Sequence, residues 1–199
     1  SSRPGLVLLE DDHLLIVDKP PGINTHAAST YGSEGLHDWL RRREPRWARL
    51  SIVQRLDKET SGVLLFGKTR EANRSLTEQF EGRTVEKTYV LRSDRSPGEL
   101  PRVIRSRIDG AEAETEFRLL GAESGFLLIE ARPLTGRTHQ IRVHAREAGF
   151  PILGDERYGG APFPRLCLHA GSLALTHPVS EEPVRVSSPA AFDEDPDLE

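Results

Sequence analysis

One stretch of the chain constrains its fold more than any other. The polar residues that end at Ser61-Gly62 lead directly into the apolar run 63–66, Val-Leu-Leu-Phe. A short apolar run after a turn signal is typical of a strand buried on both faces. Asp57 lies on this turn, so the backbone fixes the direction of its carboxylate. That arrangement suits a reactive group, and it equally suits an Asp that caps its own turn.

Length and composition predict one globular domain. The chain has 199 residues, of which 36% are hydrophobic, and a chain of this size buries about 70% of the surface that its unfolded form exposes. No apolar run approaches the ~18 residues that a membrane span needs. The single cysteine, Cys167, excludes an internal disulfide and a Cys-based zinc site. We therefore expect a monomeric protein of the reducing cytoplasm, without membrane contact.

Charge is distributed unevenly along the chain. The formal net charge of −4 argues against a nucleic-acid-binding protein. Residues 181–199, however, hold seven acids and one base, a balance of −6, which leaves about +2 for the rest. Because its end is rich in Asp and Pro, we predict an acidic, flexible tail over 181–199 behind a domain that spans 1–180.

A second basic feature is local. Five arginines lie within nine residues around Trp47, namely Arg41, Arg42, Arg43, Arg46 and Arg49. Arginines with an interleaved aromatic residue can bind phosphates and stack on bases. The alternative is the solvated end of a basic helix, with Trp47 packed in the core. The pattern by itself supports both interpretations equally.

Hydrophobic periodicity predicts an α/β fold of the α+β type. It indicates helices at 34–43 and from Thr69 to Gly82, and strands at 6–9, 14–17, 63–66, 85–91, 103–108, 115–119 and 126–131. Consecutive strands joined by short links that contain Gly pair antiparallel. The sequence thus predicts a single domain on a largely antiparallel mixed sheet with flanking helices and loops.

The stretch 135–144 is ambiguous, because its β-branched residues favour a strand while Thr138 and Gly149 frame a helix. We favour the helix, which would place His139, Arg142 and Arg146 along one side. His139 lies five residues before His144. That spacing suits neither a helix face nor a strand face, so the sequence predicts no metal site.

Five motifs, taken in order, resemble the RluA family of RNA pseudouridine synthases over about residues 6–178. They are RLDKETSGVLLFGKT at 55–69, EKTYV at 86–90, GRTHQIRVHA at 136–145, GFPILGD at 149–155 and LHA at 168–170. The resemblance implies the pseudouridine synthase fold, an antiparallel sheet with flanking helices and loops, for the catalytic domain over 1–180. It agrees with the fold predicted from periodicity.

The resemblance also implies roles for particular residues. Asp57 would be the catalytic aspartate, Tyr89 would lie against the target base, and Arg142 would be the basic partner of the aspartate. Arg55 would fill the gap left by an extruded nucleotide. Further RNA-binding candidates in the third motif are Arg137 and His139. Family members commonly have His where this chain has Gln54, which can form hydrogen bonds but cannot titrate.

The implied reaction converts uridine in RNA to pseudouridine. It is redox-neutral, and the sequence shows no phosphate-cradling Gly loop, so we expect no cofactor. The expected partner is structured RNA, transfer or ribosomal, with an accessible loop uridine. Three alternatives stay open: a non-catalytic RNA-binding relative of the same fold, a synthase of the related RsuA type, and a glycosidase that uses Glu59 as a second acid.

Overall fold

The computed structural model describes residues 6–27 and 34–194. The chain forms two compact units. Unit 1 comprises Ser1–Glu86 and Ser172–Pro189, and unit 2 comprises Lys87–Gly171 and Ala190–Glu199. The chain therefore enters unit 2 at Lys87, returns to unit 1 at Ser172, and enters unit 2 again at Ala190. None of the helices among the described residues is long and apolar enough to cross a membrane.

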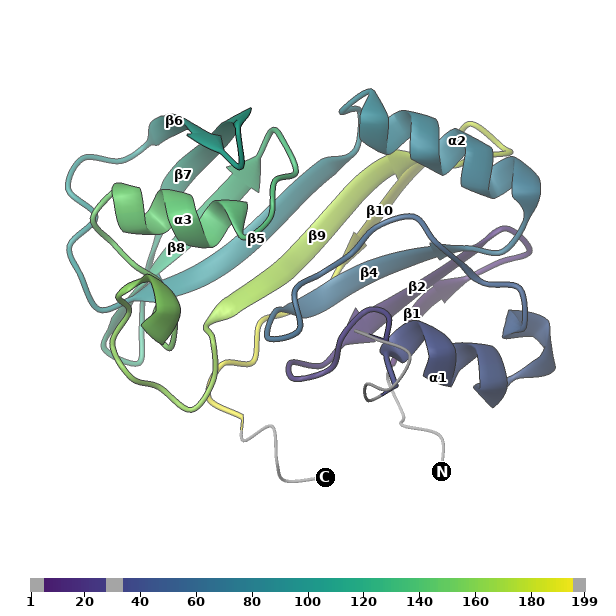
Figure 1. The fold of residues 1–199 in the computed structure, drawn as a ribbon, viewed down its shortest axis with the longest axis horizontal. Coiled ribbons are helices and arrows are strands. Elements are labelled where there is room, and N and C mark those ends of the chain that lie inside the picture. The colour runs from purple at the N-terminus through teal and green to yellow at the C-terminus, as the bar shows by residue number, and fades with distance from the viewer. Residues whose placement is uncertain (1–5, 28–33, 195–199) are drawn as a thin grey trace. The chain divides into compact units, whose positions relative to one another are not determined.

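Unit 1 is built on a sheet with two α-helices (Figure 1). Its strand order is β1-β2-β4-β9, with β10 also beside β9 and β3 beside β4. Its elements are β1 (Val7–Glu10), β2 (Leu14–Lys19), α1 (Leu36–Arg43), η1 (Pro45–Trp47), β3 (Ser51–Ile52), β4 (Ser61–Gly67), α2 (Arg70–Glu81), the second half of β9 (Leu168–Thr176) and β10 (Pro183–Ser187).

The predicted buried strand is β4, and every one of its residues is buried. Because successive side chains on a strand point to opposite faces, its two faces have different partners. Leu65 packs in one core cluster with Leu76 of α2. Phe66 stacks on His37 of α1, with ring centroids 5.9 Å apart. The two helices therefore cover opposite faces of the sheet of unit 1.

The predicted helix after Thr69 is confirmed as α2. The Thr69 hydroxyl oxygen accepts a hydrogen bond from the backbone N–H of Ala72 at 3.2 Å, which satisfies one of the free donors at the helix start. The helix ends at Glu81, and Gly82 follows as its C-cap. The helix predicted over 34–43 is confirmed as α1 with a start at Leu36.

Unit 2 is also built on β-strands, with one α-helix against them (Figure 1). Its strand order is β9-β5-β8-β7-β6, and the pairs β5–β8, β8–β7 and β7–β6 are antiparallel. Helix α3 packs against β6, β7 and β8. The elements are β5 (Glu86–Ser93), β6 (Arg102–Ile108), β7 (Ala111–Glu123), β8 (Phe126–Pro133), α3 (Gln140–Glu147), η2 (Glu156–Tyr158) and the first half of β9.

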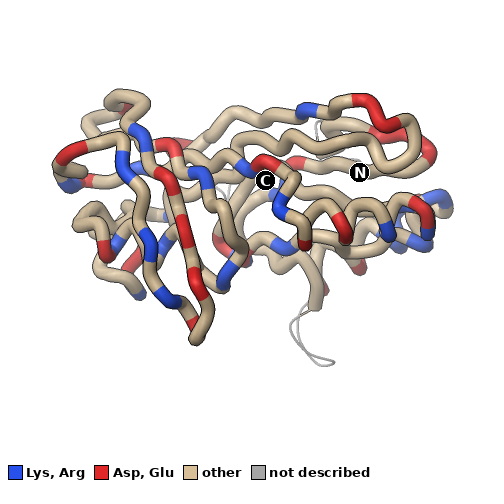
Figure 2. Tube along the Cα trace, turned by 90° about the horizontal axis from the view of Figure 1, so that it is seen from above, with Lys and Arg blue, Asp and Glu red and all other residues tan. Residues whose placement is uncertain are grey.

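The hairpin formed by β6 and β7 carries opposite charges on its two strands. Arg105 pairs with Glu114 at 2.9 Å, and Arg107 pairs with Glu112 at 3.3 Å. Figure 2 shows the blue positions along one strand and the red positions along the other. β6 is the last strand in the order of this sheet, and arginines on such an edge disfavour pairing with the strands of another molecule.

The chain end differs from the flexible tail predicted over 181–199. Residues 183–187 form β10, and Phe192 is 2% exposed in the core of unit 2. Asp193 is itself held in place, because both of its carboxylate oxygens accept hydrogen bonds from the fully buried Arg92, at 2.7 Å each. A buried guanidinium needs such counter-charges, and Glu123 also pairs with it. Residues 195–199 lie outside the described residues.

The Arg92–Asp193 pair predicts a pH-dependent stability. The hydrogen bonds from Arg92 lower the pKa of Asp193 from 3.8 to about 2. A carboxyl group with a lowered pKa contributes stability above its unfolded pKa and loses it as the pH falls through its folded pKa. We expect Asp193→Asn to melt a few degrees below the wild type at pH 7, and this difference to vanish between about pH 4 and pH 2.

Thermal unfolding followed by circular dichroism from pH 7 to pH 2 would measure this difference. Asp94→Asn is the matched control, because the one contact of the Asp94 carboxylate within the described part of the chain is a long one, 3.9 Å to Arg95 on the surface of the same unit. A difference in melting temperature that stays constant over the whole pH range would contradict the prediction.

Candidate active site

Asp57 lies at the first position of a tight turn in unit 1. The backbone N–H of Thr60 donates to the carbonyl oxygen of Asp57 at 3.0 Å, which closes the turn over residues 57–60. The buried strand β4 begins directly afterwards, at Ser61. The prediction that Asp57 occupies a turn beside a buried strand is therefore confirmed. Its side chain is partly exposed, and can be reached from solvent.

Thr25 holds the residue before Asp57 by its backbone. The Thr25 hydroxyl donates to the carbonyl oxygen of Leu56 at 3.0 Å and accepts from the N–H of the same residue at 3.1 Å. One side chain thus satisfies both backbone groups of Leu56, as a neighbouring strand would. Thr25 is 2% exposed, so water cannot replace it. The backbone that enters the turn is therefore fixed.

Lys19 holds the residue after Asp57. Its side chain is fully buried at the end of β2, and its ammonium donates to the carbonyl oxygens of Pro20, Ile23 and Lys58 at 2.8–2.9 Å. A buried ammonium is retained only where its donors are satisfied. These three bonds join the loop after β2 to the turn. The backbone on both sides of Asp57 is thus fixed by buried side chains.

Gln54 and Arg55 precede the turn. The side-chain oxygen of Gln54 accepts from the backbone N–H of Leu65 on β4 at 3.2 Å, so the residue at this departure from the family pattern makes a structural hydrogen bond. The side chain of Arg55 is exposed, one residue before the buried Leu56. An exposed guanidinium beside a fixed loop is positioned to contact a bound partner.

Arg142, on α3 in unit 2, has an acidic partner that the sequence analysis missed. Its Nε and Nη2 donate to the two carboxylate oxygens of Asp155 at 2.9 and 2.8 Å. The Asp155 side chain is 1% exposed. This bidentate pair fixes the plane and direction of the guanidinium. Asp155 is the last residue of the GFPILGD motif, so its place in that motif was the one sequence feature that could have indicated a role for it.

Gly154 explains the backbone in front of Asp155. Its φ angle is +85°, a left-handed conformation, and a Cβ at this position would overlap the carbonyl group of Arg165. Only glycine meets both conditions without strain. The local sequence therefore places Asp155 by a tight approach between two backbone segments, and Asp155 in turn places Arg142.

His139 and Arg142 meet at Tyr158 of η2. The phenol of Tyr158 is hydrogen-bonded to His139 Nδ1 at 2.9 Å, and the two rings are edge to face. The Arg142 guanidinium lies over the Tyr158 ring, 5.0 Å from its centroid, within range of a cation–π interaction. Tyr158 is a second site residue that sequence reasoning missed, because it lies beyond the motif that ends at Asp155.

The helix predicted within 135–144 is confirmed, but its start differs from the expectation. Its N-cap is His139 rather than Thr138, with a left-handed φ of +54° and no side-chain capping bond. A non-glycine residue in this region is strained, and such strain is tolerated where surrounding contacts enforce it. The contacts with Tyr158 supply part of that enforcement for His139.

His144 anchors the same helix from inside. It is fully buried, with Nδ1 2.7 Å from the Thr115 hydroxyl and Nε2 3.0 Å from the Ser106 hydroxyl. Burial lowers the pKa of His144, so the ring is neutral at physiological pH. These bonds join α3 to β6 and β7. No group of three metal-ligating side chains is found among the described residues.

The remaining candidates lie on strands and at the surface. Tyr89 is on β5 opposite Ala131 of β8, and is partly buried against the core of unit 2. Arg137 donates through Nε to the carbonyl oxygen of Glu112 at 2.9 Å. Trp47 is 5% exposed. Of the two interpretations of this segment, the one that packs Trp47 in the core is therefore correct, and the Trp47 ring is not available to stack on bases. The arginines around it, Arg41, Arg42, Arg43, Arg46 and Arg49, are exposed on unit 1.

The predicted site residues therefore divide between the two units. Asp57 and Arg55 belong to unit 1, whereas Tyr89 and Arg142 belong to unit 2. In unit 1, buried side chains hold the backbone on both sides of Asp57, and in unit 2 a buried carboxylate holds the Arg142 guanidinium. Groups on such fixed supports are suited to catalysis that depends on orientation.

Two solved human structures place this architecture in a known class. Human RNA pseudouridylate synthase domain containing 4 has a TM-score of 0.76 at 24% identity, with 93% of this chain and 88% of that chain covered. Human RNA pseudouridylate synthase domain containing 1 has a TM-score of 0.74 at 27% identity, with 92% and 82% covered. The fold is that of the pseudouridine synthases, as the sequence predicts.

The family model described as RNA pseudouridylate synthase matches residues 13–147, and the chain belongs to this family. It is similar to the ribosomal large subunit pseudouridine synthase C of Vibrio vulnificus, with 36% identity over 206 residues, and of Escherichia coli K12, with 38% over 213 residues. Each match covers 92% of this chain, which spans 65–66% of the length of these relatives. The resemblance to the RluA family is confirmed.

The bond between Thr25 and Leu56 generates a local prediction. In Thr25→Val the side chain keeps its shape but loses the hydroxyl, so both backbone groups of Leu56 lose their partner. We expect a loss of about 1–3 kcal/mol in the free energy of unfolding, together with faster hydrogen exchange at the Leu56 amide.

Urea unfolding and hydrogen exchange measured by NMR would test both effects. Thr84→Val is the matched control, because the Thr84 hydroxyl makes one exposed bond to the Gln79 carbonyl oxygen. Unchanged protection of the Leu56 amide in Thr25→Val would show that the hydroxyl does not hold the loop.

The Arg142–Asp155 pair generates a second prediction. In Asp155→Asn one charged partner of a buried ion pair is lost, while the side chain keeps its size. We expect a loss on the order of 3 kcal/mol in the free energy of unfolding. Urea unfolding measures it, with Asp109→Asn on the exposed β6–β7 turn as the control. Equal stability of the two variants would contradict a structural role for the pair.

Proposed function

We propose that this chain is an RNA pseudouridine synthase that isomerises uridine in structured RNA, with Asp57 as its catalytic residue. The observation that carries the proposal is the fixed turn of Asp57, whose neighbours Leu56 and Lys58 are held by buried Thr25 and Lys19. Membership of the pseudouridylate synthase family supports the reaction class.

The reaction explains why one fixed carboxylate suffices. Conversion to pseudouridine breaks the bond between ribose and N1 of uracil, turns the base while it stays bound, and joins the ribose to C5. The proton on C5 is lost and N1 gains a proton, so the product is an isomer of uridine. The base is both the leaving group and the group that is added back, and no water enters. Glycoside hydrolysis needs a second carboxyl group to activate water or to form an intermediate. Asp57 can act alone on the sugar or the base.

Arg142 is proposed as the basic partner of Asp57 in the reaction. An aspartate acts as a nucleophile or a base only when it is charged, and a guanidinium stays protonated at every physiological pH. The buried Asp155 already fixes two of the Arg142 nitrogens, so the direction of its remaining donors is set before RNA binds. Tyr89 would offer a flat face to the detached uracil.

The proposed substrate is ribosomal RNA with an uridine in a loop or bulge. The similar Vibrio and Escherichia proteins are named for the ribosomal large subunit. To reach the glycosidic bond the enzyme must turn the nucleotide out of its stack, which costs a few kcal/mol and least in a loop. The exposed Arg55 would occupy the vacated space, and Arg137 and His139 would contact flanking nucleotides. A monomer can perform all of these steps.

Tritium release from RNA labelled at C5 of uridine tests the proposal, because the C5 hydrogen leaves only when the new bond forms. We expect wild-type protein to release tritium from a large-subunit ribosomal RNA transcript. Asp57→Asn should reduce the rate by about 10³-fold or more, since the reacting group itself is lost. Release from the ribosomal RNA transcript but not from a transfer RNA transcript would show that the substrate is ribosomal RNA.

Glu59→Gln is the matched control for this assay. Glu59 is an exposed acid on the same turn, two residues from Asp57. We expect the Glu59→Gln variant to release tritium at the wild-type rate. Equal rates for wild type and Asp57→Asn would reject the assigned residue. RNA binding without release from any transcript would favour a non-catalytic RNA-binding protein.

A further inference from the structure

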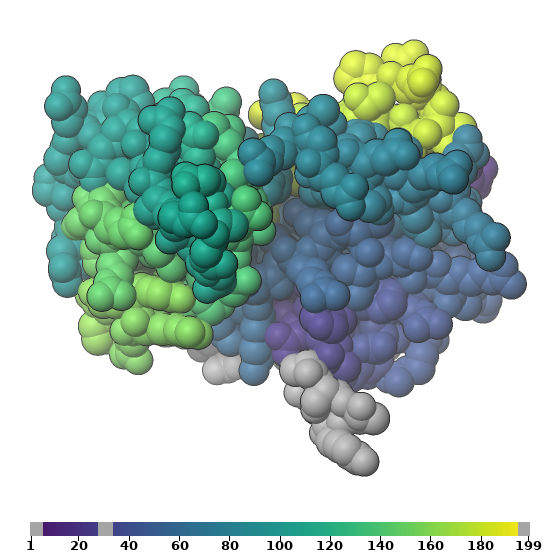
Figure 3. All heavy atoms as spheres, turned by 45° about the horizontal axis from the view of Figure 1, so that its top comes forward, coloured from purple at the N-terminus to yellow at the C-terminus, as the bar shows by residue number. Residues whose placement is uncertain are grey.

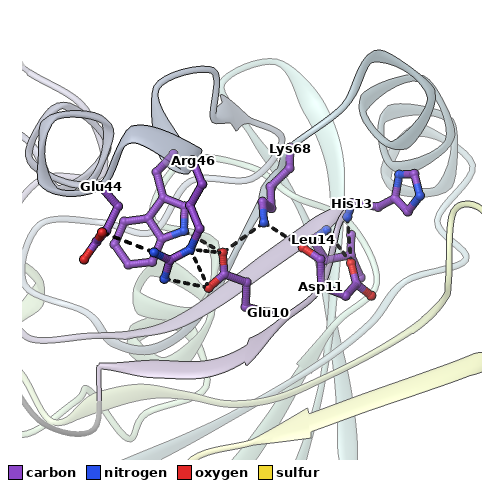
Figure 4. A network of polar contacts seen from close by, with 8 residues as sticks. Glu10, Asp11, His13, Leu14, Glu44, Arg46 and Lys68 are labelled. Atoms are coloured by element: carbon purple, nitrogen blue, oxygen red, sulfur yellow. Dashed lines mark hydrogen bonds and ion pairs between the residues drawn. The ribbon is translucent and has the colours of Figure 1, made fainter.

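The basic segment that contains Arg41, Arg42, Arg43, Arg46 and Arg49 is organised around one acidic residue, Glu10. Figure 4 shows the Glu10 carboxylate between Arg46 and Lys68. Arg46 donates from Nε and Nη2 at 3.0–3.2 Å, Lys68 Nζ donates at 2.9 Å, and Trp47 Nε1 donates at 2.7 Å. The bonds from Arg46 lower the pKa of Glu10 to about 2, so the carboxylate is charged at neutral pH.

Arg46 is therefore occupied within the protein, although about half of its side chain is exposed. Besides Glu10, it contacts Glu44 at 3.2 Å, and its guanidinium lies 4.7 Å from the centroid of the Trp47 ring. Lys68 is occupied as well: its side chain is 12% exposed and also donates to the carbonyl oxygen of Asp11 at 2.7 Å. Glu10 thus contacts two of the positively charged side chains on this part of unit 1.

Three arginines of the segment have no acidic partner among the described residues. The Arg41 Nε donates to the carbonyl oxygen of Ala48 at 3.1 Å, which leaves both terminal nitrogens available. The Arg43 guanidinium lies over the Trp39 ring. Arg49 makes no hydrogen bond or ion pair within 6–27 and 34–194. Arg42, in contrast, pairs with Glu34. In Figure 3 the colours follow residue number, and the blue atoms of this part of the chain lie on the right of the view.

The inner side of the segment is firmly attached to unit 1. Leu40, Trp47 and Leu50 are each at most 5% exposed. His37 Nε2 lies 2.7 Å from the carbonyl oxygen of Leu50, and the same ring stacks on Phe66 of β4. The exposed arginines therefore extend from a rigid base rather than from a mobile loop. A partner that binds them loses little affinity to ordering of the backbone.

We propose that Arg41, Arg43 and Arg49 form an RNA-backbone contact of unit 1, and that Glu10 withholds Arg46 and Lys68 from it. The proposal rests on the proposed function, because it takes RNA as the ligand. Phosphate binding gains affinity by releasing counterions from the RNA. An arginine that already has a carboxylate partner must give up that partner first, so it adds little. The electrostatic strength of the contact is thus set by three arginines and limited by Glu10.

The salt dependence of RNA binding separates the two groups of arginines. The measurement is the dissociation constant of a fluorescent ribosomal RNA hairpin between about 50 and 200 mM salt, by anisotropy. Loss of one phosphate contact lowers the slope of log affinity against log salt by about 0.7–0.9. We expect this change in Arg41→Gln, Arg43→Gln and Arg49→Gln. Arg46→Gln should keep the wild-type slope and lower the melting temperature.

Glu10→Gln gives the opposite and more specific result. The substitution removes the carboxylate that Arg46 and Lys68 share, so the half-exposed Arg46 keeps only its contact with Glu44 and can turn to phosphate, whereas Lys68 stays nearly buried on the Asp11 carbonyl oxygen. We expect a steeper salt dependence, by about one contact, and tighter RNA binding at low salt, together with a lower melting temperature. Arg46→Gln and Arg49→Gln decide the matter by themselves if Glu10→Gln does not fold.

Equal loss of slope in Arg46→Gln and Arg49→Gln would overturn the proposal, and so would an unchanged slope in all three of the outward arginine variants. Tritium release on the same wild-type preparation separates this outcome from failure of the proposed function. Release without any effect of the arginines on binding would reject the contact surface alone. Binding that depends on Arg49, without release, would reject the catalytic function and leave the surface in place.

Discussion

The buried ammonium of Lys19 is the interaction on which the candidate site most depends. A lysine at 0% exposure is costly, because its charge has left water. Three backbone carbonyl oxygens offset that cost, and they come from both the loop after β2 and the turn that carries Asp57. The buried ammonium therefore specifies how the loop after β2 and the Asp57 turn are arranged, because an arrangement without these carbonyl oxygens leaves its donors unsatisfied. An apolar side chain would not impose that requirement.

Elsewhere in the chain, carboxylates fix the position of charged partners in a similar way. Glu10, Asp155 and Asp193 each hold an arginine by at least two hydrogen bonds, and each of these arginines belongs to a different local structure. Asp155 is the most buried of the three, and the arginine that it orients, Arg142, is the one proposed as the basic partner of Asp57. The main effect of these three acids is therefore to fix the orientation of guanidinium groups, rather than to add negative charge.

How much could be predicted from the sequence depended on the distance between partners along the chain. The buried strand after Asp57, the Thr69 cap and the helix that contains Arg142 follow from neighbouring residues, and all three are confirmed. Thr25 and Leu56 are 31 residues apart, and Arg92 and Asp193 are 101 apart, so no local pattern indicates either pair. Strands β9 and β10 were also missed, although they are neighbours along the chain and pair with each other.

The arginine-rich segment shows why a charge count is a weak guide to partners. The net charge of −4 argues against RNA, and the five arginines argue for it, yet both counts treat every charge as available. Once folded, Arg46 and Lys68 are paired with Glu10 and Glu44, and Arg92 is paired with Asp193 and Glu123. A phosphate responds to the charges that are left after such pairing. The relevant quantity is therefore the exposed, unneutralised charge of one surface, which only the fold determines.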